Sequence, residues 1–322
     1  MDRRTFLLAA AAVPYAVASP SARGRIPGGT PLALVTADLE AHIAAVDLSS
    51  GLIVRRVPTL PDPRSIESVL GRSALVAHTA AGALSLIDGP SLRVRAVVRG
   101  FAAPRYTAAD RGGRYAFVTD SGRGDVAVVD LVRAEVLARV DLDGPARHVS
   151  LSPSGKQLWV ALGSKAQEVA IVDVRRPARP RLVARLRPPF LAHDVGFTPD
   201  GRSVWVTSGD RGTIAIYDTR ARRIRLRLSA DAPPQHVTFI GGRAYVASGD
   251  DGSLRLHEVA GGRLLATTRV PIGSYNVQQG WGVVLTPSLT RGTLCVVRRG
   301  GRMLHRVEAA RSSHDACFVM SR

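Results

Sequence analysis

Histidine is the residue type with the clearest positional bias in this chain of 322 residues. Four of the eight histidines lie in one short window that recurs along the sequence, just before a predicted strand; they are His148, His193, His236 and His314. Asp194 and Asp315 directly follow two of them, and the corresponding windows elsewhere hold Tyr106, Asn276 and the stretch 65–67. Imidazole can bind anions, transfer protons and ligate metals. A fold that brings these windows together would therefore build a functional site.

The elements that must position these residues form an internal repeat. A short β-type run ending in Asp recurs at Asp47, Asp88, Asp130, Asp173 and Asp218, at spacings of 41, 42, 43 and 45 residues. Two further copies end at Glu258 and Arg298, each 40 residues on. Seven units of about forty residues have the period of propeller blades.

Each unit contains four short runs rich in valine and isoleucine, separated by turns such as SPSG, TPDG and GDDG. Four short strands per unit make one blade, so we predict an all-β, seven-bladed β-propeller over residues 31–322. Residue 31 begins at the second strand of a unit, and the C-terminal DACFVMS matches an isolated first strand. We therefore expect the C-terminal strand to pair with residues 32–37 and close the ring, which removes the open edges.

The strands YAFVTD, LWVAL, VWVTS and AYVAS, with SPSG or TPDG just before some of them, resemble the YVTN-type propeller repeat. The resemblance covers residues 31–322. It implies the seven-bladed fold and leaves the function open, because the family includes binding proteins, lactonases and haem-binding relatives.

In a propeller the first strand of each blade lines the central channel, so the histidine windows should ring one mouth of it. One interpretation is structural: the repeat places a polar residue there to satisfy backbone groups around a wet channel. The other is a site for a small anion or polar molecule, held at the channel mouth by Tyr106, His148, His193, Asp194, His236, Asn276, His314 and Asp315. In that case these side chains face solvent, and anion binding strengthens as the pH falls through the ordinary histidine pKa near ~6.5.

The four histidines do not share one register. His193 and His314 lie four residues before a Phe, whereas His148 and His236 lie three before Leu151 and Phe239. A shift of one residue turns a strand side chain to the other face, so the four need not all point into the channel.

Two repeated sets of charges have structural explanations. The strand-ending aspartates are expected to accept hydrogen bonds from turn N–H groups. The alternating arginines Arg223, Arg225 and Arg227 are expected on an outermost strand, where charges discourage edge-to-edge pairing.

The N-terminus has the pattern of an export signal. Residues 1–18 contain Arg3-Arg4, then Phe6-Leu7, a short apolar run and the small-x-small sequence Ala16-Val17-Ala18. This resembles a twin-arginine signal, which implies export of a folded protein; an ordinary secretory signal is the alternative. Residues 19–30 are expected to be a flexible lead-in, and no transmembrane segment is expected in the mature protein.

The chain carries a formal charge of +18, and 42 of its 44 basic residues are arginines, spread along the whole chain. No basic helix or zinc finger accompanies the charge, so we do not expect a nucleic-acid partner. Cys295 and Cys317 lie in no CxxC or CxxCH motif, and whether they pair stays open.

No nucleophile elbow, phosphate loop or paired catalytic carboxylates occur, so no catalytic residue and no metal ligand is assigned. The sequence predicts an exported, monomeric binding or scaffold protein that recognises a small polar ligand or a protein partner at the channel mouth. The alternatives are a lactonase-like hydrolase and a channel that binds a non-covalent redox cofactor or a metal.

Overall fold

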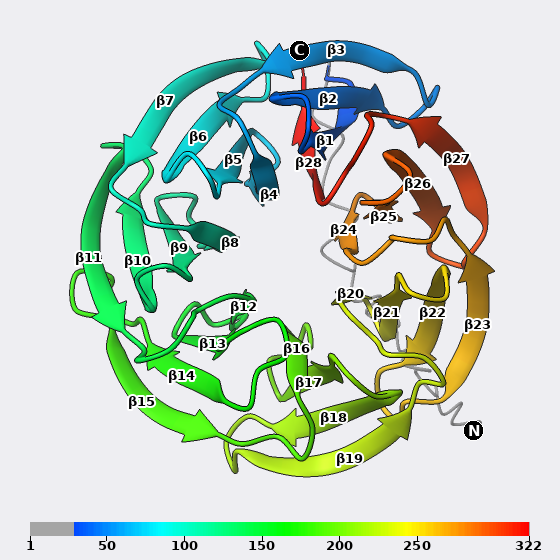
Figure 1. Ribbon diagram of the computed structural model, residues 1–322. Coiled ribbons are helices and arrows are strands. Elements are labelled where there is room, and N and C mark those ends of the chain that lie inside the picture. The colour runs from blue at the N-terminus through cyan, green and yellow to red at the C-terminus, as the bar shows by residue number, and fades with distance from the viewer. Residues whose placement is uncertain (1–28, 322) are drawn as a thin grey trace, which may run out of the picture.

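The computed structural model describes residues 29–321 and shows a closed ring of seven four-stranded antiparallel sheets. Viewed along its axis, the ring places the first strand of every blade at the centre and the fourth at the rim (Figure 1). Residues 29–321 form no helix, and so none that is long and apolar enough to cross a membrane. The seven-bladed propeller predicted from the repeats is confirmed. The predicted signal at residues 1–18 and most of the lead-in lie outside the described residues.

The inner strands are β4 (Pro63–Val69), β8 (Pro104–Ala109), β12 (Val149–Leu151), β16 (Ala192–Phe197), β20 (Val237–Ile240), β24 (Gln278–Gly280) and β28 (Ala316–Met320). The second strands are β1 (Pro31–Ala37), β5 (Ser73–His78), β9 (Tyr115–Asp120), β13 (Gln157–Ala161), β17 (Ser203–Ser208), β21 (Arg243–Ser248) and β25 (Val283–Pro287). The third strands are β2 (His42–Asp47), β6 (Ala83–Asp88), β10 (Asp125–Asp130), β14 (Val169–Asp173), β18 (Thr213–Asp218), β22 (Ser253–Glu258) and β26 (Thr293–Arg298). The outer strands are β3 (Ile53–Pro58), β7 (Arg93–Arg99), β11 (Glu135–Asp141), β15 (Arg181–Leu186), β19 (Arg223–Ser229), β23 (Leu264–Arg269) and β27 (Met303–Glu308).

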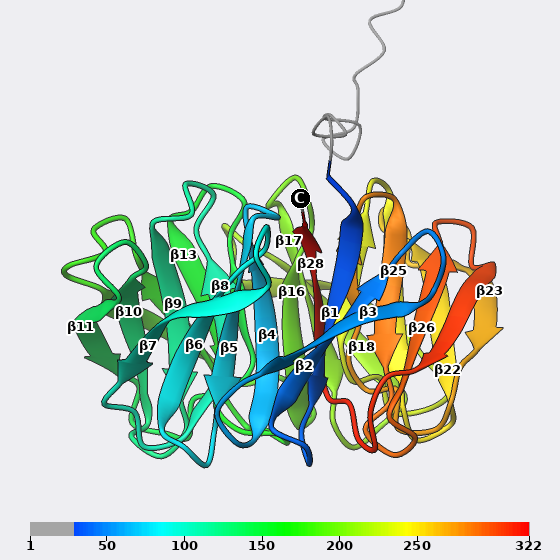
Figure 2. The ribbon, with the colours of Figure 1, turned by 90° about the horizontal axis from the view of Figure 1, so that it is seen from above.

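Ring closure occurs as predicted. The C-terminal strand β28 pairs antiparallel with β1, with Leu32 opposite Val319 and Leu34 opposite Cys317. Figure 2 shows the two strands side by side although they come from opposite ends of the chain. Each blade is thereby flanked by two others, and the edge of β1 that faces the channel is paired with β28.

Apolar side chains fill the seam between each pair of neighbouring blades. Strand β17 shows how one strand serves two seams: Val204 and Val206 pack toward the blade of β13, whereas Trp205 packs toward the blade of β21. Successive strand residues point to opposite faces, and both faces are covered here. Most of the second and third strands are therefore nearly continuous apolar runs. Strand β22 is an exception, because Ser253, Arg255 and His257 alternate with apolar residues.

The repeated charges have the predicted structural roles. Each strand-ending aspartate accepts a hydrogen bond from a backbone N–H of the following turn, that of Ser49, Ser91, Val132, Arg175 or Arg220. Arg223, Arg225 and Arg227 lie exposed on the outer strand β19. The two cysteines are free and buried, Cys295 in the seam beside β21 and Cys317 in the seam beside β5.

Candidate functional site

Two consecutive residues from each blade face the channel where the inner strand begins. In five blades the second member of the pair directly precedes the first residue that pairs regularly with the neighbouring strand, as at Val149 and Val237. We call these second members the lower ring; they are Ser65, Tyr106, His148, Asp194, His236, Asn276 and Asp315. The residues before them form the upper ring, which comprises Arg64, Arg105, Arg147, His193, Gln235, Tyr275 and His314.

A threonine of the second strand holds this part of several blades in place. Thr119 accepts a hydrogen bond from the Tyr106 N–H, Thr207 from the Asp194 N–H, and Thr36 from the Asp315 N–H. In the blade of β24, Thr286 donates to the carbonyl of Asn276. These bonds hold the first residues of the inner strand against the second strand, although the backbone pairing between the two strands is irregular in some blades.

The register difference between the histidines is real. His148 and His236 belong to the lower ring, whereas His193 and His314 belong to the upper ring and are followed by Asp194 and Asp315 in the lower one. Strand β16 has an irregularity between Ala192 and Val195, which inserts one extra residue.

All four histidines nevertheless reach the channel. The ring centroid of His148 lies 4.4 Å from that of His193 and 4.8 Å from that of His236, and the rings of His193 and His236 are 5.3 Å apart. Tyr106 lies against this group, 4.3 Å from His148 and 6.0 Å from His314. The rings of these five residues, which we call the ring cluster, close the middle of the channel.

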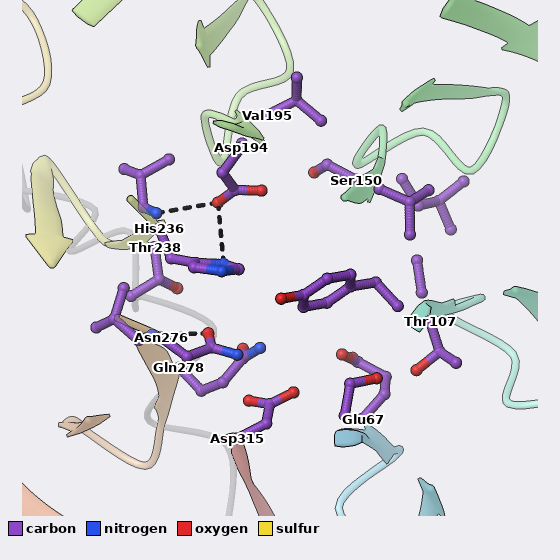
Figure 3. A pocket seen from close by; sticks show the side chains of 18 of the residues that line it. Glu67, Thr107, Ser150, Asp194, Val195, His236, Thr238, Asn276, Gln278 and Asp315 are labelled. Carbon is purple, nitrogen blue, oxygen red and sulfur yellow. Dashed lines mark hydrogen bonds and ion pairs between the residues drawn. The ribbon is translucent and has the colours of Figure 1, made fainter. Parts of the chain in front are cut away.

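The remaining predicted residues surround the ring cluster. Figure 3 shows Asp194 beside His236, and the distance between Asp194 Oδ2 and His236 Nδ1 is 3.5 Å. Asp315 accepts hydrogen bonds from the N–H groups of Ile66 and Ala316, and Asn276 accepts one from the N–H of Val277. The structure therefore brings all eight predicted site residues to one region.

Two expectations about the histidines are wrong. Three of them are not solvated: the exposed fraction of His148 is 1%, and those of His236 and His314 are 6%, whereas His193 is half-buried. Burial lowers the pKa of His193 and of His236 to about 3, and it places the pKa values of His148 and His314 well below the ordinary one. These imidazoles are neutral throughout the physiological range, so they cannot strengthen anion binding near pH 6.

The ring cluster separates two cavities, and Tyr106 and His236 line both of them. The mouth cavity, on the side of the upper ring, has a volume of about 330 Å³ and is lined by the cations Arg64, Arg147 and Lys165 and by one carboxylate, Asp250. The inner cavity, on the side of the strands, has a volume of about 340 Å³ and is lined by Glu67, Asp194 and Asp315. The channel is thus basic on one side of the ring cluster and acidic on the other.

The mouth cations are crowded and incompletely paired. Arg64 forms an ion pair with Asp38 at 3.2 Å. Arg147 and Lys165 have no ion-pair partner among residues 29–321, and the Nε of Arg147 is buried with no hydrogen-bond partner there. Burial, together with the charges of Arg147 and Arg64, lowers the pKa of the neighbouring Arg105. An anion entering this cavity would relieve both the repulsion and the missing hydrogen bonds.

The inner cavity holds carboxyl groups that resist ionisation. Figure 3 shows Glu67 and Asp315 on the same side of the cavity. Burial raises the pKa of each to about 8, and for Glu67 the charge of Asp315 adds to the effect. Burial also raises the pKa of Asp194 to about 6. A protonated carboxyl can donate a hydrogen bond as well as accept one, so Glu67 and Asp315 offer both roles to a ligand in this cavity.

The mouth cations were missed from the sequence. The signal was present, because Arg64, Arg105 and Arg147 each directly precede a lower-ring residue. The general abundance of arginine hid this alignment. Lys165 has no such signal: it lies in the segment between β13 and β14 and reaches the mouth only through the fold.

No protein-family model matches the chain, and no curated protein matches it in sequence. Solved structures are similar in fold. A Kuenenia stuttgartiensis hydrazine synthase chain has a TM-score of 0.73 at 17% identity, with 84% of this chain and 92% of that chain covered. A candidate 6-phosphogluconolactonase from Bacteroides fragilis has a TM-score of 0.75 at 11% identity, with 92% and 99% covered. A protein of unknown function from Desulfotomaculum acetoxidans has a TM-score of 0.77 at 12% identity, with 89% and 98% covered.

These similarities concern the fold. They agree with the seven-bladed architecture that the YVTN-type resemblance implies, while no family model supports membership of that family. At such identities a propeller can serve unrelated functions, so the function must be argued from the channel residues.

Proposed function

We propose that this protein is an exported binding protein that captures a small anion, a carboxylate or a phosphate, in the mouth cavity. The observation that carries the proposal is the side chain of Arg147, whose Nε is buried at the mouth without a hydrogen-bond partner among residues 29–321. A buried donor left unsatisfied costs about 1–3 kcal/mol. An arginine fork matches the oxygens of a carboxylate or phosphate, and such a ligand removes that cost.

The surroundings of Arg147 suit a ligand of metabolite size. Lys165 adds a second cation without an ion-pair partner among the described residues, and Arg64 a third that is shared with Asp38. Gln235 and Tyr275 supply polar groups, although both already bond to Asp250. The volume of about 330 Å³ lies in the range of small-molecule sites, and the neutral ring cluster forms the floor.

Export is the second part of the proposal, and it rests on residues 1–18. Replacing Arg3 and Arg4 by lysine should leave the precursor in the cytoplasm in a folded, protease-resistant form. The measurement is fractionation of cells that express the wild type or the double variant. Normal export of the double variant would favour an ordinary secretory signal instead.

Calorimetric titration tests the anion site. Phosphate, sulfate, acetate, small di- and tricarboxylates and a sugar phosphate are titrated into the full-length protein at low salt with EDTA present. We expect at least one of them to bind, and Arg147→Ala to weaken that ligand about 10- to 100-fold, since hydrogen bonds to charged groups contribute about 1.5–3 kcal/mol.

The matched control is Arg225→Ala. Arg225 is exposed on the outer strand β19, far from the channel in the order of the strands, and its removal changes the net charge equally. We expect its effect on affinity to be under about twofold. If every anion binds the wild type and Arg147→Ala equally, or if Arg225→Ala weakens binding as much, the proposal is wrong.

Hydrolysis of small cyclic esters is a second candidate. It is supported by the pair Glu67 and Asp315 in the inner cavity, where a protonated carboxyl could act as a general acid. A structure of similar fold is also described as a candidate lactonase. A lactone panel with Glu67→Gln as the comparison tests this candidate, which fails if turnover is absent or unchanged in the variant.

A further inference from the structure

Three histidines of the ring cluster lie close enough together to be candidate ligands of one metal ion. His148, His193 and His236 belong to three consecutive blades, and one nitrogen of each lies within 4.8 Å of the other two. A buried histidine is more often hydrogen-bonded within a core than bound to a metal. The partners of these three rings therefore decide between the two roles.

The outer nitrogens of two rings are already oriented. His193 Nδ1 lies 2.9 Å from the carbonyl oxygen of Ser164, and His236 Nδ1 lies 3.5 Å from Asp194 Oδ2. An oxygen acceptor beside the far nitrogen places the proton there and leaves the Nε2 lone pair free. Backbone carbonyls and carboxylates take this position behind histidines that ligate metals.

The third ring has no partner for either nitrogen. Both nitrogens of His148 are buried and lack a hydrogen-bond partner among residues 29–321, and the side chain is 1% exposed. It lies against His193 and His236, with centroid separations of 4.4 and 4.8 Å. An imidazole buried with two unsatisfied nitrogens is costly, so its position needs an explanation that packing alone does not give.

We infer that His148, His193 and His236 form a site for one divalent transition-metal ion of the zinc type. Three imidazoles without a thiolate or an oxygen-rich shell favour Zn²⁺ and similar ions over Mg²⁺ and Ca²⁺. Three protein ligands leave a fourth position for water or a small anion, as in catalytic zinc sites. His193 and His236 also line the mouth cavity, through which such a ligand would arrive.

The required movement is small. Zinc–nitrogen bonds of about 2.0–2.1 Å in a tetrahedron separate two ligand nitrogens by about 3.4 Å. The nitrogens lie within 4.8 Å now, so binding draws the three rings closer together. The inference does not rest on the anion site, because it uses neither Arg147 nor Lys165 as a ligand.

Metal titration of the full-length chain, prepared without a polyhistidine tag and stripped with EDTA, tests the site. We expect one Zn²⁺ per chain by elemental analysis after desalting, and a visible absorption band when Co²⁺ replaces it. His148→Gln should weaken Zn²⁺ binding by more than about 100-fold. Asp194→Asn changes the oxygen beside His236 Nδ1 and the acceptor of the Val237 N–H, and it should weaken Zn²⁺ binding about 10- to 100-fold.

His257→Gln is the matched control. His257 is 2% exposed, its Nδ1 lies 3.0 Å from the carbonyl oxygen of Gly262, and its Nε2 is unpartnered among residues 29–321, but Trp205 is its aromatic neighbour. This variant should retain full Zn²⁺ occupancy.

Two results would overturn the site. One is a wild-type chain that retains no Zn²⁺ and shows no Co²⁺ band. The other is equal metal loss in His257→Gln and His148→Gln. Circular dichroism checks the fold of each variant. If His148→Gln does not fold, the wild-type stoichiometry and Asp194→Asn decide the question.

Discussion

The seams between blades and the central channel use residues of the same repeat in opposite ways. In the seam beside β17, Trp205 is fully buried among apolar side chains and contacts the ring of Phe239 edge-on. In the channel, Arg147 and His148 are placed where their nitrogens lack partners among the described residues. The seam also buries one atom without a partner among the described residues, Trp205 Nε1, but apolar contacts dominate there. The seams therefore supply stability, whereas under the proposed function the channel gives up stability to hold groups ready for a ligand. Substitutions in the two regions should separate these roles.

The largest effect is expected from opening the ring. Deleting residues 315–322 removes β28 and exposes the edge of β1, including Leu34 in one seam and Val35 in the other. The loss should approach the whole stability of the fold, about 5–15 kcal/mol, and lead to aggregation. Soluble yield and thermal melting measure it.

Truncation after Met320 is the control, because it keeps every residue of β28. A protein without residues 315–322 that is as soluble and stable as this control would contradict the role of the closing strand.

A single seam residue should have a smaller but still large effect. Trp205→Ala leaves a cavity in the seam between the blades of β17 and β21, and we expect a loss of about 3–5 kcal/mol in the free energy of unfolding. Val97→Ala, on the half-exposed face of β7, should cost less than about 1 kcal/mol. Chemical denaturation measures the free energy of unfolding of both variants. Equal losses of stability would refute the distinction between residues in a seam and residues on an outer strand.

The sequence predicted the seams better than the channel. The run Val204-Trp205-Val206 and its six counterparts recur at a fixed period, so strand number, blade order and closure followed from spacing alone. The eight predicted site residues also proved to be neighbours, because the repeat carries them to one axis.

What could not be predicted depends on contacts between blades. The register difference between the histidines was visible in the sequence spacing, but the irregularity between Ala192 and Val195 was not. The burial of His148 arises only when residues of several blades meet. Solvation and pKa values in the channel were for this reason predicted wrongly.

A carboxyl group in the inner cavity should affect stability in a pH-dependent way. The pKa of Glu67 is about 8 in the folded protein, above the ordinary value of 4.5. Between these values the unfolded chain ionises while the folded one stays protonated, so stability falls as the pH rises from about 4.5 to about 8.

Glu67→Gln removes that loss. We expect the variant and the wild type to melt alike near pH 4, and the variant to melt a few degrees higher at pH 8 or above. Melting curves across this range measure the difference. A constant difference at all pH values would mean that Glu67 does not titrate as described.

The central claim is that the side chain of Arg147 binds a ligand and contributes no stability to the fold. The most direct test is the melting temperature of Arg147→Met, measured with and without the anion that binds the wild type best. Because the variant loses only an unsatisfied buried donor, its unfolding free energy without ligand should stay within about 0.5 kcal/mol of the wild type or exceed it. The anion should raise the melting temperature of the wild type but not that of the variant. A variant that is destabilised by several kcal/mol, or that is still stabilised by the anion to the same extent, would contradict the claim.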